Sequence, residues 1–270
     1  MVATDPLLAD VRDGIATLTL NRPEVLNAFT AEMGHELESA YRFCDTEDDV
    51  RVVLLTGSGR AFCSGADLSR GADAFGTGGE GFRADPFDFH AWDVRKPVIA
   101  AVNGPAIGLG LTMALHCDLR IVAADAQLGV VQVRRGVMPD LRSHWTLPRL
   151  VGYARATELL LTGCRFSGVE AAAWGLANEV TDAAHVLDRA TELARELAVH
   201  VAPLSAAFTK RLLWREPPPS RDHVGHYETE LHRHLMNGPD VGEGVRAFLE
   251  SRDPKWTGSV THDWPDWLDT

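Results

Sequence analysis

Two short runs of small residues and glycine carry the clearest chemical signal in the sequence. Residues 61–67 read Ala-Phe-Cys-Ser-Gly-Ala-Asp, and residues 103–110 read Asn-Gly-Pro-Ala-Ile-Gly-Leu-Gly. Each run is predicted to lie where a strand gives way to a turn or a helix, which leaves backbone N–H groups without partners. Two such amides that converge on one point form an oxyanion hole, which stabilises negative charge on a carbonyl oxygen. The pair therefore predicts a site that polarises a carbonyl group.

The second run is predicted to open a helix. It follows an apolar segment, residues 97–102, and leads into residues 111–116. The amides of a first helical turn have no partners within the helix and lie at the positive end of its dipole, where an anionic oxygen is stabilised. Taken alone, the run fits equally well a tight turn that needs glycine only for close packing. The presence of the first run favours the oxyanion hole.

The elements that must position these runs alternate as in an α/β protein. Strands are predicted at residues 11–20, 51–56, 97–102 and 119–123. A helix is predicted over residues 30–43, because Thr30 is a good N-cap and apolar residues recur at helical spacing behind it. The last three strands are short apolar runs, which are typical of buried parallel strands. A mostly parallel sheet covered by helices is therefore expected.

The last third of the chain is predicted to be helical. Helices are expected at residues 182–198, 203–214 and 241–251. Residues 167–170 read Ser-Gly-Val-Glu, which is the spacing of a capping box at the start of another helix. Neither an internal repeat nor a linker marks a second globular domain.

A glycine-rich stretch, residues 71–81, interrupts the alternation of strands and helices. Aromatic residues follow it, up to residue 95. Aromatic side chains favour a segment that packs over something apolar, whereas dense glycine is typical of a long loop. The segment 71–95 is therefore predicted to be either a lid over a ligand pocket or a plain surface insertion.

Composition limits the partners and the compartment. The 270 residues include 26 Lys and Arg against 38 Asp and Glu, a net charge of −12, which repels nucleic acid and anionic membranes. No window approaches the roughly 18 consecutive apolar residues of a membrane span, and from the first residues, which have neither a basic stretch nor an apolar core, we do not expect secretion. The 4 cysteines are widely spaced, and the histidines near the C-terminus do not share one helix face. We expect a cytoplasmic protein with free thiols and no metal site.

Further short motifs accompany the two runs in order along the chain. They are Asn21-Arg22-Pro23 with Asn27-Ala28, Lys96-Pro97-Val98-Ile99-Ala100-Ala101-Val102, Cys117-Asp118, Leu147-Pro148-Arg149-Leu150-Val151-Gly152, Phe166-Ser167-Gly168, Gly175-Leu176-Ala177-Asn178 and the tail from Phe248 to Gly258. Together with the two runs, this ordered set resembles the crotonase (enoyl-CoA hydratase/isomerase) superfamily over nearly the whole chain. Each motif is weak by itself, and the ordered combination is specific.

The resemblance implies the fold, the ligand and the assembly. The fold is an α/β spiral of repeated ββα units in residues 1–195, which holds the oxyanion hole and the acyl-CoA site. A C-terminal helical region, residues 196–270, follows it and mediates trimer contacts. The ligand is an acyl-CoA thioester, so coenzyme A arrives as part of the substrate and no separate cofactor is needed. The assembly is a homotrimer or a dimer of trimers.

The resemblance also implies roles for individual residues. The backbone amides of Ala66 and Leu109 supply the two oxyanion donors, although Leu109 stands where the family commonly has glycine. The residues expected to line the path of coenzyme A are Arg22, Val25, Ala28, Ser64, Ala66, Asp67, Leu68, Leu109 and Gly110. Phe248 and Lys255 are expected to reach the adenosine end from a neighbouring helix or subunit.

The residues behind the oxyanion hole depart from those of a hydratase. Hydratases of the family use two glutamates, and Thr112 and Gln132 stand at the corresponding positions. Neither side chain exchanges a proton near neutral pH. One carboxylate remains, that of Asp140, whose place matches the acid/base aspartate of double-bond isomerases in the superfamily.

The predicted function is therefore isomerisation of an enoyl-CoA through a thioester enolate, with Asp140 as the single acid and base. Burial against apolar acyl carbons raises the pKa of such a carboxylate. A structural role for Asp140 is the competing interpretation, in which it caps the following turn or pairs with Arg134, Arg135 or Arg142. A weak enoyl-CoA hydratase and a non-catalytic acyl-CoA-binding protein are the alternative functions.

Overall fold

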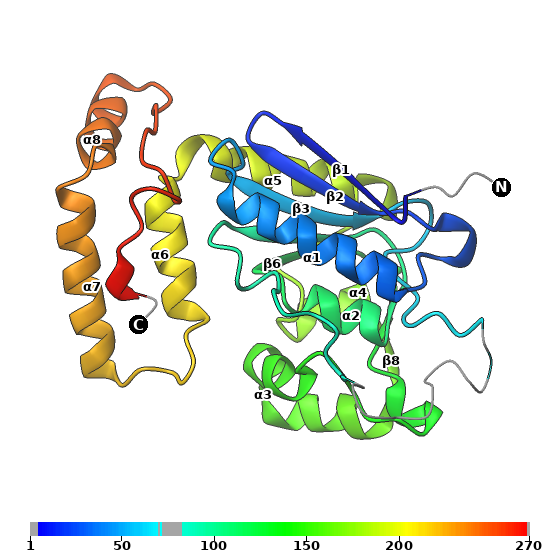
Figure 1. Ribbon diagram of the computed structural model, residues 1–270. Helices are drawn as coiled ribbons and strands as arrows, with labels where there is room; N and C mark the ends of the chain where they lie inside the picture. Colours follow the sequence, from blue (N-terminus) through cyan, green and yellow to red (C-terminus); the bar gives the residue numbers. More distant parts are fainter. Residues whose placement is uncertain (1–4, 70, 72–82, 269–270) are drawn as a thin grey trace.

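The computed structural model of the 270-residue chain describes residues 5–69, 71 and 83–268 (Figure 1). Of the segment 71–95, where the sequence predicts a lid or a surface insertion, residues 72–82 lie outside the described residues. The described chain forms two sheets with helices packed around them, and the helices of its C-terminal region stand beside the sheets (Figure 1).

The larger sheet forms the centre of the fold. In spatial order its strands are β1 (Leu7–Arg12), β2 (Ile15–Leu20), β3 (Val52–Gly57), β4 (Val98–Val102), β6 (Leu119–Ala123) and β9 (Glu179–Thr181). β1 pairs antiparallel with β2, and the later pairs are parallel, as the short apolar runs predict. Strands of this kind are buried on both faces, and every residue of β3 and β4 is buried.

One predicted strand is a hairpin. The sequence predicts a single strand over residues 11–20, but Asp13 and Gly14 both adopt left-handed backbone conformations, with φ of 51° and 77°. An Asp-Gly pair is a preferred two-residue turn between antiparallel strands, because both residues tolerate positive φ. The alternating pattern therefore covers the end of β1, the turn and β2.

The smaller sheet brings the second glycine run to its place. Its strands are β5 (Ala106–Ile107), β7 (Gln127–Gly129) and β8 (Arg165–Ser167), with β5 parallel and β8 antiparallel to β7. The N–H of Gly108 continues the pairing by donating to the carbonyl of Gly129 at 2.8 Å. The chain then turns directly into α2 (Leu109–Ala114), so the end of β5 fixes where this helix begins.

Helices pack against the sheets and extend beyond them. The remaining α-helices are α1 (Ala31–Thr46), α3 (Ser143–Thr162), α4 (Gly168–Ala173), α5 (Val186–His200), α6 (Pro203–Leu213), α7 (Arg221–Met236) and α8 (Asp240–Glu250). Short 3-10 helices are η1 (Pro23–Val25), η3 (Gln132–Arg135), η4 (Ala183–His185) and η5 (Asp266–Leu268). α1 packs on β1 and β2, and α5 packs along β3, β4 and β6. α6, α7 and α8 lie to one side (Figure 1), and the boundary predicted at residue 195 falls inside α5.

Local signals account for some helix starts and fail for one long helix. Thr30 Oγ1 accepts from the amide of Met33 at 3.2 Å, and Ser167 and Glu170 form the complete capping box ahead of α4. The sequence pattern does not predict α3, because Pro148 lies inside it and Gly152 breaks its helical backbone, with φ 74° and ψ 163°. A helix interrupted in this way lacks a continuous apolar periodicity.

α2 lies against the first glycine run with no room between them. A Cβ added at Gly110 would lie 2.3 Å from the carbonyl oxygen of Cys63. Cys63 is itself bridged to Ala106 of β5, so the first run cannot easily move away. Glycine at position 110 therefore sets how closely α2 approaches the run.

Gly110→Ala is expected to destabilise the protein, because its methyl group overpacks this backbone contact at a cost of about 1–3 kcal/mol. We expect the melting temperature in thermal unfolding to fall by several degrees. Gly225→Ala is the matched control, since a Cβ at Gly225 in α7 meets nothing within 4 Å. Alanine there should leave the melting temperature equal or higher. Equal melting temperatures for the two variants would contradict the proposed contact.

Candidate active site

The two glycine runs meet through their backbones. The amide of Cys63 donates to the carbonyl of Pro105 at 3.1 Å, and the amide of Ile107 donates back to the carbonyl of Cys63 at 3.0 Å. Gly65, with φ of 97°, lies so close that an added Cβ would come within 2.8 Å of the Ile107 oxygen and 3.9 Å of the Leu109 nitrogen. Backbone contact therefore places the start of α2 beside the first run.

The amides of Ala66 and Leu109 have no hydrogen-bond partner in the described part of the chain. Phe29 pairs with the residues on either side of Ala66, because its N–H donates to Gly65 and its carbonyl accepts from Asp67, at 2.8 and 2.9 Å. In this parallel pairing the N–H of Ala66 points away from Phe29. Leu109 is the first residue of α2, where no preceding turn supplies an acceptor. Across the described residues, no hydrogen bond uses either N–H.

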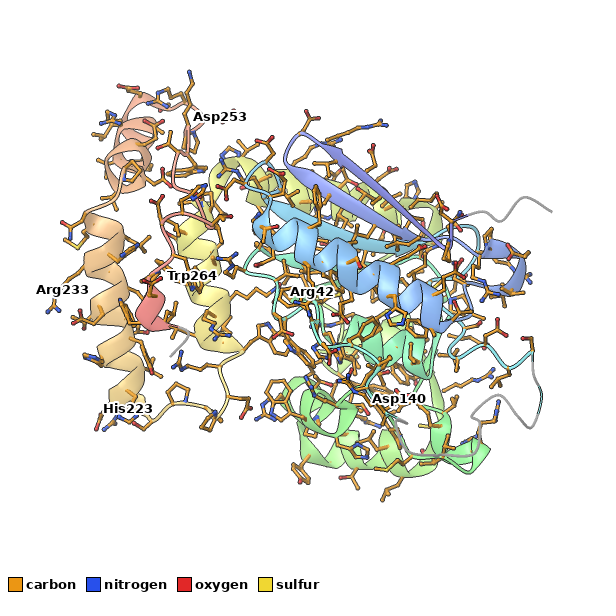
Figure 2. The ribbon with its side chains drawn as sticks, in the orientation of Figure 1. Arg42, Asp140, His223, Arg233, Asp253 and Trp264 are labelled. Atoms are coloured by element: carbon orange, nitrogen blue, oxygen red, sulfur yellow. The ribbon has the colours of Figure 1, made fainter. Side chains whose placement is uncertain are left out.

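Both residues line one pocket of about 90 Å³, together with Asp140. Figure 2 shows Asp140 beside α2 and α3, on the side of the molecule away from α7. Apolar side chains line the same pocket, among them Leu68, Val131 and Val137. Two backbone donors and one carboxylate thus border a partly apolar space.

One oxygen of Asp140 accepts hydrogen bonds from two other residues, and the backbone of Asp140 itself also interacts with the carboxylate. Thr112 Oγ1 donates to Oδ1 at 2.8 Å, and Gln132 Nε2 donates to the same oxygen at 3.0 Å. Among the described residues, no other residue donates a hydrogen bond to Oδ2. Thr112 and Gln132 are both buried, so these two hydrogen bonds are shielded from water. Thr112 and Gln132, which the sequence analysis expects at the positions of the hydratase glutamates, therefore both hold the carboxylate of Asp140.

Burial raises the pKa of Asp140 above its ordinary value, because its surroundings solvate a carboxylate poorly. The hydrogen bonds from Thr112 and Gln132 oppose this rise, and the negative charge of Asp85 adds to it. A raised pKa suits a group that must both take up and release a proton near neutral pH.

The competing structural role of Asp140 accounts for the hydrogen bond of its backbone carbonyl but not for the contacts of its carboxylate. Its carbonyl accepts from the amide of Ser143 at 3.0 Å, as in a turn that precedes a helix. In the part of the chain that the structure describes, its carboxylate forms no ion pair with the nearby arginines, Arg134, Arg135 and Arg142. In the described structure, no salt bridge therefore neutralises the carboxylate.

Buried polar contacts hold the loop that carries Asp140. Leu141 and Arg142 both have left-handed backbones, with φ of 46° and 50°, which is a strained conformation for residues other than glycine. His116 Nε2 donates to the carbonyl of Leu141 at 2.7 Å, and the amide of Leu141 donates to the carbonyl of Ala84 at 3.3 Å. Burial lowers the pKa of His116 to about 3, so its ring is neutral and donates through Nε2–H.

A second buried histidine is linked to the same loop through charged residues. His90 Nε2 lies 2.9 Å from Asp85 Oδ2, and His90 Nδ1 lies 3.0 Å from Asp93 Oδ2. Burial opposes charge on all three groups, yet their mutual contacts raise the pKa of His90 and lower those of Asp85 and Asp93. An imidazolium therefore lies between two carboxylates. Asp85 also pairs with Arg142 at 3.3 Å, which links the cluster to the loop after Asp140.

Sequence reasoning missed this cluster, and only its aromatic neighbours gave a signal. Asp85, His90 and Asp93 follow neither helical nor strand periodicity, so no pattern brings them together. Trp92, in the aromatic part of the segment 71–95, stacks on His90 at 4.6 Å between ring centroids and contacts His116 at 3.9 Å. Phe87, in the same segment, packs edge-on against Phe29 at 5.8 Å between ring centroids, and this is the apolar contact of the kind that the aromatic residues predicted.

Residues expected along the path of coenzyme A gather at the first glycine run. Arg22 donates to the carbonyl of Ala28 at 2.5 Å and pairs with Asp67 at 2.9 Å. Ser64 Oγ donates to the carbonyl of Val25 at 3.3 Å. The turn around η1 therefore lies directly beside the pocket that the run helps to form.

Two other expected residues lie elsewhere in the chain. Phe248 is exposed on α8. Figure 2 shows Asp253, which is close to Lys255 in sequence, at the end of the molecule away from Asp140. Within one chain, Phe248 and Lys255 do not line the pocket, so their contact with coenzyme A stays a prediction about a neighbouring subunit.

Two kinds of feature are absent from the described part of the chain. No group of three or more His, Cys, Asp and Glu side chains there is arranged to hold a metal ion. No helix of that part has the length and apolar character needed to cross a membrane. The cysteines, Cys44, Cys63, Cys117 and Cys164, form no disulfide.

Comparison with known proteins decides the family. The family model described as enoyl-CoA hydratase/isomerase matches residues 10–259. The chain belongs to this family. It is an enzyme of the enoyl-CoA hydratase/isomerase type that acts on acyl-CoA, with the α/β crotonase fold that the sequence predicts.

Similar members of the family include hydratases and an isomerase. The crystal structure of a probable enoyl-CoA hydratase/isomerase from Mycobacterium abscessus superposes with a TM-score of 0.91 at 49% identity, covering 94% of this chain and 99% of that one. The 1,2-epoxyphenylacetyl-CoA isomerase of Escherichia coli (strain K12) is 37% identical over 258 residues, 93% of this chain and 98% of that protein. Enoyl-CoA hydratase AFT3-1 of Alternaria alternata is 36% identical over 252 residues, 92% and 84% of the two chains.

Asp140→Asn is expected to stabilise the protein at neutral pH. The pKa of Asp140 in the folded state lies above its unfolded value, so its ionised form costs stability above the folded pKa. This cost disappears as the pH falls below the unfolded pKa. The melting temperature of Asp140→Asn should therefore exceed that of the wild type near about pH 8, and the difference should shrink toward about pH 4.

Asp85→Asn is the matched control with the opposite sign. Although burial opposes it, the contact with His90 lowers the pKa of Asp85, so its ionised form stabilises the fold above the unfolded pKa. This contribution is lost as the pH falls through the folded pKa. Asp85→Asn should lower the melting temperature at neutral pH. Equal destabilisation by both substitutions would show that the assigned charge states are wrong.

Proposed function

We propose that the protein moves the double bond of an enoyl-CoA between the 3 and 2 positions. The observation that carries this proposal is the single carboxylate of Asp140, tethered through one oxygen in the pocket that the amides of Ala66 and Leu109 border. Isomerisation needs one group that removes a proton from one carbon and returns it to another. It also needs donors that stabilise the enolate between these steps.

The geometry supports a two-step proton transfer. The thioester carbonyl oxygen accepts hydrogen bonds from the amides of Ala66 and Leu109. Oδ2 of Asp140 takes the proton from the α-carbon of a 3-enoyl thioester, and the negative charge spreads over the dienolate to the carbonyl oxygen. The protonated Asp140 then returns the proton to the γ-carbon, which leaves the double bond at the 2 position. The tether on Oδ1 persists through both steps.

Hydration is the second candidate, because several relatives are named enoyl-CoA hydratases. A hydratase must activate a water molecule and also protonate the α-carbon, and Thr112 and Gln132 supply neither an acid nor a base. The 1,2-epoxyphenylacetyl-CoA isomerase at 37% identity acts by its name on an epoxide, so it shows only that similar proteins include an isomerase besides the hydratases. We therefore place isomerisation first.

We further propose how the substrate and the assembly are arranged. The spiral core, residues 1–195, binds the acyl-CoA, and the helical region, residues 196–270, forms trimer contacts. Coenzyme A passes beside the turn around η1 and the first glycine run, along Arg22, Val25, Ala28, Ser64, Asp67, Leu68 and Gly110. Phe248 and Lys255 of a neighbouring subunit reach its adenosine end. The exposed position of Phe248 on α8 supports a role outside its own chain.

Asp140→Asn should lower kcat for conversion of 3-hexenoyl-CoA to 2-hexenoyl-CoA by about 10²–10⁴-fold, because asparagine cannot carry the proton. The reaction is followed by the absorbance of the conjugated product. Asp125→Asn, the same chemical change at an exposed turn, is the control and should keep the wild-type rate. An unchanged rate in Asp140→Asn would remove Asp140 from the mechanism. Hydration of crotonyl-CoA that outpaces isomerisation in the wild type would favour the second candidate.

Leu109→Pro tests the oxyanion hole by deleting one donor. Proline has no N–H and is accepted at the first position of a helix, so α2 should still form. We expect kcat to fall by about 10²–10³-fold, the usual effect of losing one oxyanion donor. Leu109→Ala keeps the amide and should lose far less activity. Similar rates for the two variants would show that the amide of Leu109 does not contact the substrate.

A further inference from the structure

The ring of His90 joins two carboxylates that flank it in the sequence. Its Nε2 lies 2.9 Å from Asp85 Oδ2, and its Nδ1 lies 3.0 Å from Asp93 Oδ2. The side chain of His90 is only 2% exposed, so little water reaches either ring nitrogen. A neutral imidazole has one N–H and can donate to one carboxylate, whereas an imidazolium donates to both. The two contacts together therefore require the protonated ring.

The titratable groups that face His90 come from its own segment, from α2 and from the loop before α3. Burial lowers the pKa of His90, but the contacts with Asp85 and Asp93 outweigh burial and raise it above its ordinary value. His116 of α2 packs edge-on against His90 at 5.2 Å between ring centroids, and burial lowers its pKa to about 3, so it is neutral. Arg142 pairs with Asp85 at 3.3 Å. The charge of His90 therefore depends mainly on the two carboxylates.

The backbone of Leu141 connects this cluster to Asp140. The amide of Leu141 donates to the carbonyl of Ala84 at 3.3 Å, and Ala84 lies next in the chain to the first of the two carboxylates. The carbonyl of Leu141 accepts from His116 Nε2 at 2.7 Å, and the ring of His116 packs against His90. Both backbone polar groups of the residue after Asp140 are therefore held by groups that lie beside His90.

The loop depends on this support because its backbone is strained. Leu141 has a left-handed conformation with φ of 46°, which persists only where the surroundings hold it. The ion pair between Arg142 and Asp85 is a weaker link, since the side chain of Arg142 is 52% exposed. When His90 loses its proton, one carboxylate faces a ring nitrogen that cannot donate, and the hold on the loop weakens. A displacement of about 1 Å at a reacting group can cost about 10²-fold in rate.

We propose that His90 is a positioning residue for the reaction of Asp140, and that its imidazolium keeps Asp140 in place for proton transfer. The inference rests on the proposed function, because it concerns the base of that reaction. Activity then requires Asp140 to be ionised and His90 to be protonated. The dependence of kcat on pH is therefore bell-shaped, with an acid limb that belongs to Asp140 and an alkaline limb that belongs to His90.

The first test measures kcat and KM for 3-hexenoyl-CoA between about pH 5 and pH 9. The wild type should lose activity as the pH rises through the pKa of His90. His90→Gln cannot be protonated, so it should keep the acid limb, lack the alkaline limb and have a kcat lowered by up to about 10²-fold. Its KM should stay close to that of the wild type, because the amides of Ala66 and Leu109 and the path of coenzyme A are untouched.

A second variant changes the charge of the cluster while keeping its shape. Asp93→Asn retains an oxygen that accepts from Nδ1–H of His90 but removes one negative charge. The pKa of His90 should fall by about one unit or more, and the alkaline limb should move to lower pH by the same amount. His144→Gln is the control, because it removes an exposed histidine of α3 close to Asp140 in the sequence. This variant should leave the alkaline limb in place.

Hydrogen exchange of the loop gives a readout that needs no turnover. Mass spectrometry follows the exchange of residues 138–145 in the free protein, corrected for the intrinsic effect of pH on exchange. Protection of this segment in the wild type should be about tenfold higher at about pH 6 than at about pH 9. His90→Gln should show the lower protection at both pH values. The buried strand β4 reports global stability and should stay protected throughout.

The two readouts separate this inference from the proposed function. A wild type without an alkaline limb, or a limb that neither His90→Gln nor Asp93→Asn changes, would overturn the role of His90 and leave the isomerase standing. Protection of residues 138–145 that does not depend on His90 would overturn it as well. A wild type that does not isomerise 3-hexenoyl-CoA, but whose loop loses protection with the proton of His90, would refute the isomerase and support the role of His90.

Discussion

The closeness of the two glycine runs is the constraint on which the site depends. Because the carbonyl oxygen of Cys63 occupies the space that a side chain at Gly110 would need, α2 begins directly against the first run. That position leaves the amide of Leu109 without an acceptor at the border of the pocket. It also brings Thr112, further along α2, within hydrogen-bond distance of Asp140. A contact between backbones thus positions both the amide of Leu109 and the residue that holds Asp140.

Among the described residues, the charged groups near Asp140 pair with one another and not with its carboxylate. The side-chain partners of Asp140 are a hydroxyl and an amide, which fix one oxygen without the large fall in pKa that a contacting cation would cause. The charged groups form a separate cluster, in which Asp85 joins His90 to Arg142. This cluster and the neutral His116 hold the strained loop, whereas Thr112 and Gln132 hold the carboxylate itself.

The features predicted from the sequence are those set by local chemistry or by the family pattern. The cap at Thr30 is local, and the resemblance grouped Ala66, Leu109 and Asp140, which the structure brings to one pocket. Features that depend on distant contacts were missed. The sequence lacks the two expected glutamates, but this does not predict that Thr112 and Gln132 both donate to one oxygen of Asp140. No periodicity in the sequence links His90 to its two carboxylates. The hairpin turn at residues 13–14 was missed because the alternation of apolar and polar residues continues through it. The left-handed backbone of the two turn residues does not interrupt that alternation.

The tether on Asp140 also has a stereochemical consequence. Thr112 and Gln132 hold the same oxygen, so the carboxylate presents its other oxygen from one fixed direction. The amides of Ala66 and Leu109 fix the thioester, and with it the plane of the dienolate, in the same pocket. In the proposed reaction the proton therefore leaves the α-carbon and enters the γ-carbon on the same face. The rearrangement is a suprafacial 1,3-shift, and a deuterium label at the departing position travels with the carboxyl group to its new carbon.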